Sequence, residues 1–132
     1  MLEYVRRGGN MPAESLNIDT VIREDSVVIH LRGAADTLGL NTLKAALDHV
    51  RRNGIRRVVV ECSGLKYANS SALGHLAAFR RQMYVQGGRV VLAGVRGPVE
   101  QSLRLLRMDK VFRVYPDLDA ALENINRDTV IR

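Results

Sequence analysis

A run of three valines, Val58-Val59-Val60, restricts the fold of this chain more than any other feature. The run is β-branched and has no alternation of apolar and polar residues, which is typical of a strand buried on both faces of a sheet. Val90-Val91-Leu92-Ala93 has the same character, and apolar residues at helical spacing lie between the two runs. A strand, a helix and a second strand form a right-handed crossover, so the two runs predict parallel strands of one sheet.

Four segments carry apolar residues at the spacing of one helix face. These stripes are Leu40, Leu43, Leu47 and Val50; Ala72, Leu76, Phe79 and Met83; Val99, Leu103 and Leu106; and Leu118, Ala121, Leu122 and Ile125. Asn53-Gly54 and Gly87-Gly88 are typical helix ends after the first two stripes. Pro98 fits the first turn of the third helix.

Residues 16–22 and 27–31 alternate between apolar and polar, and the turn Glu24-Asp25-Ser26 between them predicts an antiparallel hairpin. Residues 111–115 predict an edge strand. The order is therefore strand, strand, helix, strand, helix, strand, helix, strand, helix. The fold class is α/β, with a mixed, mostly parallel sheet of about five strands and about four helices. Binding sites in such sheets gather beyond the carboxyl ends of the strands, here the loop after Val58–Cys62.

The 132 residues have the usual size of one domain. Residues 1–14 contain Gly8-Gly9-Asn10 and Pro12 without an apolar period, so we expect a flexible N-terminal arm followed by the domain over residues 15–132. No stretch is apolar enough to span a membrane, and the start of the chain lacks the hydrophobic segment of a signal peptide. The single cysteine, Cys62, gives no disulfide framework. We therefore expect a cytoplasmic protein.

The net charge of +6 is carried by scattered arginine pairs, and aromatic residues make up only 5% of the chain. This favours a solvated basic face over direct nucleic-acid binding. The histidines, His30, His49 and His75, do not share metal-ligand spacing, and no glycine-rich loop has the pattern of a nucleotide-binding site. Cys62 adjoins Glu61, which raises the pKa of its thiol. We expect a protein that is not an enzyme and binds no cofactor or metal.

Asn69-Ser70-Ser71 precedes the helical stripe that begins at Ala72. This places the Ser70 hydroxyl at or beside an N-cap, where amide donors and the positive end of the helix dipole favour an anion. A phosphate there would be tolerated by the domain. The same residues are also ordinary N-cap chemistry, and that structural role is the alternative.

Residues 58–74 resemble the signature of STAS domains of the anti-sigma factor antagonist family. That signature is a buried strand, a polar loop with an aromatic residue, and Asp-Ser-Ser-Gly-Leu-Gly at the start of a helix. Here the last part reads Asn69-Ser70-Ser71-Ala72-Leu73-Gly74. Residues 31–36 also resemble the family segment after the second strand, with Ala35 in place of leucine. Asn69 stands in place of the family's aspartate, and Ala72 in place of its glycine.

The resemblance implies a protein that binds an anti-sigma serine kinase of the histidine-kinase-like ATPase type and thereby releases a sigma factor. The kinase would inactivate the antagonist by phosphorylating Ser70, with Ser71 as a secondary candidate, and a serine phosphatase would restore it. The alternative role of Asp36 is that of a helix cap. The sequence does not decide between a monomer and a homodimer. The implied partner surface consists of Asp36, Asn69, Ser70, Ser71, Ala72 and Leu73.

A second hypothesis is a non-switching STAS scaffold, either in a stress-signalling complex or as a subunit of a lipid-transport ATPase. Asn69 favours it more than an aspartate would, because the aspartate belongs to the phosphorylated motif. A third hypothesis, a small-molecule pocket beside the motif loop, has little support in the sequence.

Overall fold

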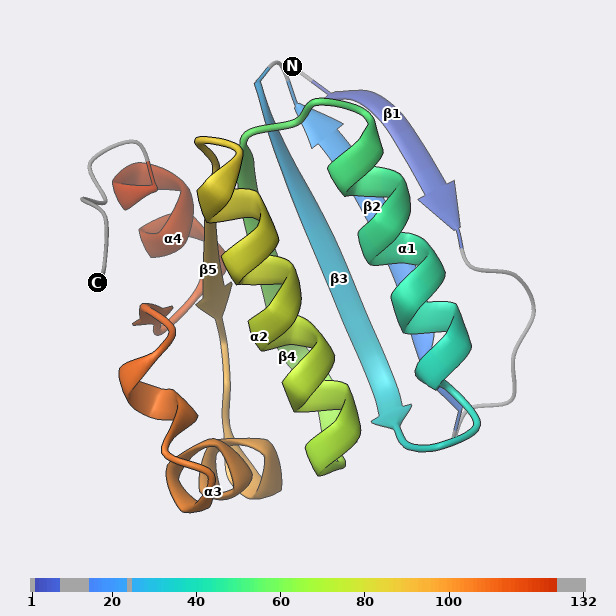
Figure 1. The fold of residues 1–132 in the computed structure, drawn as a ribbon, viewed down its shortest axis with the longest axis vertical. Helices are drawn as coiled ribbons and strands as arrows, with labels where there is room; N and C mark the ends of the chain where they lie inside the picture. Colours follow the sequence, from blue (N-terminus) through green and yellow to red (C-terminus); the bar gives the residue numbers. More distant parts are fainter. Residues whose placement is uncertain (1, 8–14, 24, 126–132) are drawn as a thin grey trace.

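The computed structural model describes residues 2–7, 15–23 and 25–125, and they form one sheet covered by helices (Figure 1). The elements in chain order are β1 (Leu2–Arg7), β2 (Asn17–Arg23), β3 (Ser26–Ala35), α1 (Leu40–Arg52), β4 (Arg57–Ala68), α2 (Ser70–Val85), β5 (Arg89–Ala93), α3 (Gly97–Leu105), the short 3-10 helix η1 (Met108–Lys110), β6 (Val114–Tyr115) and α4 (Leu118–Asn124). The strands lie in chain order across the sheet. The pairs β1–β2 and β2–β3 are antiparallel, and the three later pairs are parallel. The predicted α/β class and mixed sheet are confirmed.

Strand β1 lies within residues 1–14, where we expected an arm. It pairs antiparallel with β2, so Leu2–Arg7 correct that expectation, while residues 8–14 lie outside the described residues. Without β1, the outer edge of β2 would carry unpaired N–H and C=O groups, and β1 satisfies them by backbone hydrogen bonds. Such pairing does not require a periodic pattern of apolar side chains in β1. A pattern of side chains therefore did not indicate this strand. The boundary at residue 15 stays a prediction.

The helices form two layers around the sheet. Figure 1 shows α1 and α2 side by side across one face, and Leu103 of α3 belongs to the same core cluster. Val58 and Val60 face this cluster, whereas Val59 packs with Ala121 on the other face. All three valines are buried, so the expectation of a strand enclosed on both faces is confirmed.

Strand β4 is longer than expected. The segment after Cys62, predicted as a loop, continues as strand to Ala68. It stays paired because β3 is also long, with Leu65 opposite Gly33 and Ala68 opposite Ala35, past register shifts that let the two strands curve together. Buried Leu65 and Ala68 hold this extension on the core. Strand β4 therefore leads directly into α2.

The segment between α3 and α4 also differs from expectation. Leu106, predicted to be buried, is exposed, because α3 ends there and Arg107 takes a left-handed conformation with a φ of 59°. The chain then forms η1, and Phe112 is the residue that enters the core. Only Val114 and Tyr115 pair with β5, so β6 is shorter than the strand predicted over residues 111–115.

Candidate functional site

The ends of β3 and β4 meet at one edge of the sheet, beside the first turn of α2. The N–H of Asn69 donates a hydrogen bond of 3.0 Å to the carbonyl of Ala35. This bond joins the residue before α2 to the last residue of β3. The turn after β3 and the start of α2 therefore lie side by side at the carboxyl ends of two parallel strands (Figure 1), where binding sites of such sheets gather.

Asn69 is the N-cap of α2. Its backbone is extended, with φ −79° and ψ 173°, and its Oδ1 accepts a hydrogen bond of 2.8 Å from the N–H of Ala72. Its carbonyl accepts the first helical bond, from Leu73, at 3.1 Å. Asn69 thus fixes the start of the helix with a neutral side chain.

Ser70 is the first residue of α2, and it is exposed to solvent, as is Ser71. The predicted position of Ser70, beside an N-cap at the start of a helix, is confirmed, while its phosphorylation stays a prediction. The first turn of α2 contains no acidic residue. Since the amino end of a helix has a positive electrostatic potential, an anion on Ser70 would meet no repulsion from that turn.

Asp36 does not cap α1. Its Oδ1 accepts hydrogen bonds from the N–H groups of Leu38, at 3.1 Å, and Gly39, at 3.2 Å. The N-cap of α1 is Gly39, which makes no side-chain cap bond. Asp36 therefore holds the turn before the helix, which corrects the alternative that it caps the helix.

The family model of the STAS domain matches residues 17–121. This chain belongs to the STAS domain family. It is similar to the structure of an anti-sigma factor antagonist from Mycobacterium paratuberculosis, with 25% identity, a TM-score of 0.78 and coverage of 89% of this chain and 98% of that one. The family resemblance found in the sequence is thereby confirmed.

Two further structures share the fold at lower identity. One is the Bacillus cell fate determinant SpoIIAA in its phosphorylated form, with 16% identity, a TM-score of 0.65 and coverage of 83% of this chain and 98% of that one. The other is a sulfate transporter family protein from Wolinella succinogenes, with 16% identity, a TM-score of 0.69 and coverage of 81% and 89%. The fold thus occurs in proteins of different function, so the function must be argued from the site.

Of the six residues expected on the partner surface, two point inward in this STAS domain. Ala72 and Leu73 are buried in the core, with exposed fractions of 0% and 1%. Their side chains fasten the first turn of α2 to the sheet. Ser70 and Ser71 are exposed, and Asp36 and Asn69 are half-buried.

Sequence reasoning missed two exposed residues at the edge of the sheet where α2 begins. Leu38, in the turn held by Asp36, is 86% exposed, and Tyr67, two residues before Asn69, is 48% exposed. Tyr67 belongs to the aromatic position of the motif, which offered a signal. Leu38 is separate from the helical stripe that begins at Leu40, and this separation was the only indication that it would not be buried.

Cys62 is not a reactive thiol. Burial, together with the charge of Glu61, raises its pKa from 9.0 to about 12. Cys62 is buried in the core, with an exposed fraction of 2%, and a neutral thiol there is a poor nucleophile.

Glu61 accepts hydrogen bonds from the N–H and the hydroxyl of Ser63, at 3.2 and 3.0 Å, and its Oε1 lies 3.6 Å from Nδ1 of His30. His30 and Glu61 follow Val28 and Val59 at strand spacing, so they share the sheet face opposite α1 and α2, away from the Ser70 edge.

Across the residues that the structure describes, no cluster of three or more His, Cys, Asp or Glu is arranged to hold a metal ion. In the same part of the chain, every helix is too short or too polar to cross a membrane.

Proposed function

We propose that this STAS domain is a cytoplasmic anti-sigma factor antagonist that is switched off by phosphorylation of Ser70. The observation that carries the proposal is an exposed serine as the first residue of α2, directly after the strand that opens the STAS motif. The unphosphorylated domain binds an anti-sigma serine kinase of the histidine-kinase-like ATPase type, and the sigma factor is released. The similarity to an anti-sigma factor antagonist along nearly the whole chain supports this role.

The switching step is a phosphoryl transfer. The Oγ of Ser70 attacks the γ-phosphorus of ATP in the kinase, ADP leaves, and a base of the kinase takes the hydroxyl proton. The product carries about −1.5 to −2 charges at neutral pH. A serine phosphatase removes the phosphate by hydrolysis and restores the binding form.

Electrostatics favour partner release over unfolding as the result of phosphorylation. An exposed anion at a helix amino end is stabilised by about 0.3–1 kcal/mol, and the first turn of α2 has no acidic residue to oppose it. An unpaired charge buried in an interface costs several kcal/mol. A loss of about 3–4 kcal/mol weakens binding several hundredfold. The fold therefore tolerates a charge that the interface does not.

Asn69 keeps this switch compatible with the fold. Its Oδ1 bond to Ala72 is the cap bond that an aspartate would make, but it adds no negative charge beside the phosphate. A phosphate on Ser70 therefore meets less repulsion here than beside the family's aspartate.

The test is a phosphorylation assay with the purified chain, ATP and each serine kinase of this type encoded in the same genome, read by mass spectrometry of the intact protein and its peptides. We expect one phosphate, on Ser70, in the wild type and in Ser71→Ala, and none in Ser70→Ala. A wild type that no such kinase modifies, or a Ser70→Ala variant that still gains the phosphate, contradicts the proposal.

The alternative is a non-switching scaffold or subunit, which the replacement of the motif aspartate by Asn69 favours. Such a protein would remain in one assembly whether or not ATP is supplied. The mass of the complex recovered from cells, with and without a Ser70→Asp substitution, separates the two. The antagonist loses its kinase on this substitution, whereas the scaffold keeps its partners.

A further inference from the structure

Two large apolar side chains are exposed at the edge of the sheet where Ser70 lies. Leu38 is 86% exposed and Tyr67 is 48% exposed. Exposed apolar side chains grouped around one point of a surface are characteristic of protein interfaces, whereas single ones are common everywhere. We call Leu38 and Tyr67 the apolar pair.

The backbone places the pair on the two strand ends that meet beside Ser70. Tyr67 is aligned with Ala34 across β4 and β3, and Asn69 donates its N–H to the carbonyl of Ala35. Leu38 follows Ala35 in the turn after β3. The pair therefore comes from the loop before α1 and from the strand end before α2, next to the first turn that carries Ser70.

The turn holds Leu38 in place. The Oδ1 of Asp36 accepts from the N–H groups of Leu38 and Gly39, at 3.1 and 3.2 Å, and the N–H of Gly39 also reaches the carbonyl of Asp36 at 3.1 Å. Gly39 is buried, and a Cβ at this position would lie 2.8 Å from the Cβ of Leu16. The turn is thus fastened to the core, and Leu38 is presented to solvent by a backbone that is already ordered.

We infer that the apolar pair supplies the main apolar contacts through which this STAS domain holds the kinase that phosphorylates Ser70, and that Asp36 is a positioning residue for Leu38. The inference rests on the proposed function and names the surface by which that partner is bound. The complementary face of the kinase offers an apolar recess for a leucine and an aromatic ring. Because an ordered turn loses little conformational freedom on binding, Leu38 is suited to be a dominant contact.

The same geometry explains why a phosphate on Ser70 would release the kinase. Contacts around a dominant apolar residue exclude water from the centre of an interface. A doubly charged group on Ser70, beside such an interface, would then lose its hydration without gaining a partner. The kinase would accept the serine hydroxyl in that position and would reject the phosphoserine.

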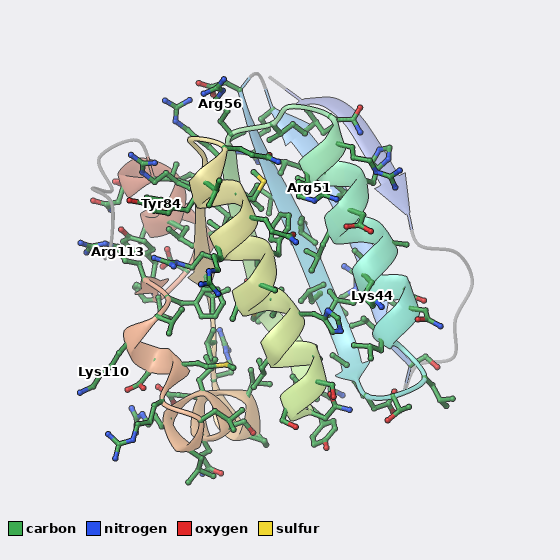
Figure 2. The ribbon with its side chains drawn as sticks, viewed as in Figure 1. Lys44, Arg51, Arg56, Tyr84, Lys110 and Arg113 are labelled. Atoms are coloured by element: carbon green, nitrogen blue, oxygen red, sulfur yellow. The ribbon has the colours of Figure 1, made fainter. Side chains whose placement is uncertain are left out.

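The experiment measures the Kd between the kinase loaded with ADP and the purified chain by calorimetry. Leu38→Ala and Tyr67→Ala are each compared with a matched control on another part of the surface. Leu105→Ala removes a leucine that is 83% exposed at the end of α3. Tyr84→Ala removes an exposed tyrosine close to the carboxyl end of α2, far from its first turn (Figure 2). We expect about a tenfold or greater weakening for Leu38→Ala and Tyr67→Ala, and less than about twofold for both controls.

Asp36 is tested by a conservative pair of variants. Asp36→Ala removes the acceptor for Leu38 and Gly39, so we expect the affinity to fall by about as much as in Leu38→Ala. Asp36→Asn keeps an Oδ1 acceptor without the charge, and we expect it to restore most of the affinity. A residue that acted by charge on the kinase would not be rescued by asparagine. Equal losses in both variants therefore overturn the positioning role.

The outcomes separate this inference from the proposed function. If the kinase phosphorylates Ser70 but Leu38→Ala and Tyr67→Ala bind as tightly as Leu105→Ala and Tyr84→Ala, the inference fails and the proposed function stands. If no kinase binds or modifies the wild type, the proposed function fails first. The side chains of Leu38 and Tyr67 are exposed, so we expect neither substitution to lower the Tm. Melting curves of the variants test whether a lost affinity is instead caused by unfolding.

Discussion

Replacing Asn69 by alanine tests whether one neutral side chain sets the start of α2. The substitution removes the 2.8 Å bond from the N–H of Ala72 to Oδ1 and leaves that donor without a protein partner. Loss of an N-cap side chain costs about 1 kcal/mol, within a range of about 0.5–2 kcal/mol. Leu73 and Leu76 remain packed in the core, so the helix persists beyond its first turn. For a domain of this size, 1 kcal/mol lowers the Tm by roughly 3–6 °C.

The assay is urea unfolding followed by far-ultraviolet circular dichroism, with Asn41→Ala as the matched control. Asn41 is an exposed asparagine in the first turn of α1. We expect the midpoint to fall for Asn69→Ala at an unchanged m-value, and no loss for Asn41→Ala, since alanine has the higher helix propensity. A loss below about 0.3 kcal/mol for Asn69→Ala, smaller than the least effect of about 0.5 kcal/mol seen on removal of an N-cap side chain, refutes the capping role.

Asn69→Asp extends this test with a pH dependence. Aspartate keeps the acceptor and adds a negative charge at the amino end of α2, for a gain of about 0.3–1 kcal/mol at neutral pH. The helix end lowers the pKa of that aspartate in the folded state below its unfolded value of about 3.9. The gain is therefore present above about pH 4 and is lost as the pH falls through the folded pKa. A gain that persists unchanged at pH 2 contradicts this electrostatic origin.

Three further substitutions concern one core cysteine and two glycines. The pKa of Cys62 is raised from 9.0 to about 12, so its stabilising contribution is complete below pH 9 and declines as the pH rises toward 12. The advantage of the wild type over Cys62→Ala in unfolding free energy should therefore narrow by about 1–2 kcal/mol between pH 8 and pH 10.5, and a constant difference refutes it. Gly94→Ala should cost about 1–3 kcal/mol, because Gly94 has a φ of 71° and a Cβ there lies 2.8 Å from Glu61 Oε2. Gly74→Ala lies inside α2, where the new Cβ meets no atom within 4 Å apart from its chain neighbours and the backbone of its own helix, and it should instead stabilise the domain by about 0.5–1 kcal/mol. Thermal unfolding of both variants checks the opposite signs.

The features that the sequence predicted correctly are those set by local patterns. A valine run predicted the central strand, and Asn69-Ser70 predicted the start of α2, because burial on both faces and capping each leave a signature within a few residues. The extension of β4 to Ala68 was missed, since it depends on pairing with a distant strand. Strand β1 was missed for the same reason. Leu38 was missed because its exposure follows from the turn that Asp36 holds.

At this edge of the sheet, the atoms that fix the position of α2 differ from the atom that would bear the phosphate. The bond from the N–H of Asn69 to Ala35 and the bond from Ala72 to Asn69 Oδ1 hold the first turn of α2 in place, and neither uses the hydroxyl of Ser70. A phosphate on that hydroxyl would therefore alter the surface without breaking a bond that the fold requires. Substitutions at Asn69 should shift stability and kinase binding together, whereas substitutions of the Ser70 hydroxyl should shift binding alone. A Ser70→Ala variant that melts several degrees below the wild type would show that the hydroxyl is part of the scaffold, and the separation on which the proposed switch depends would not exist.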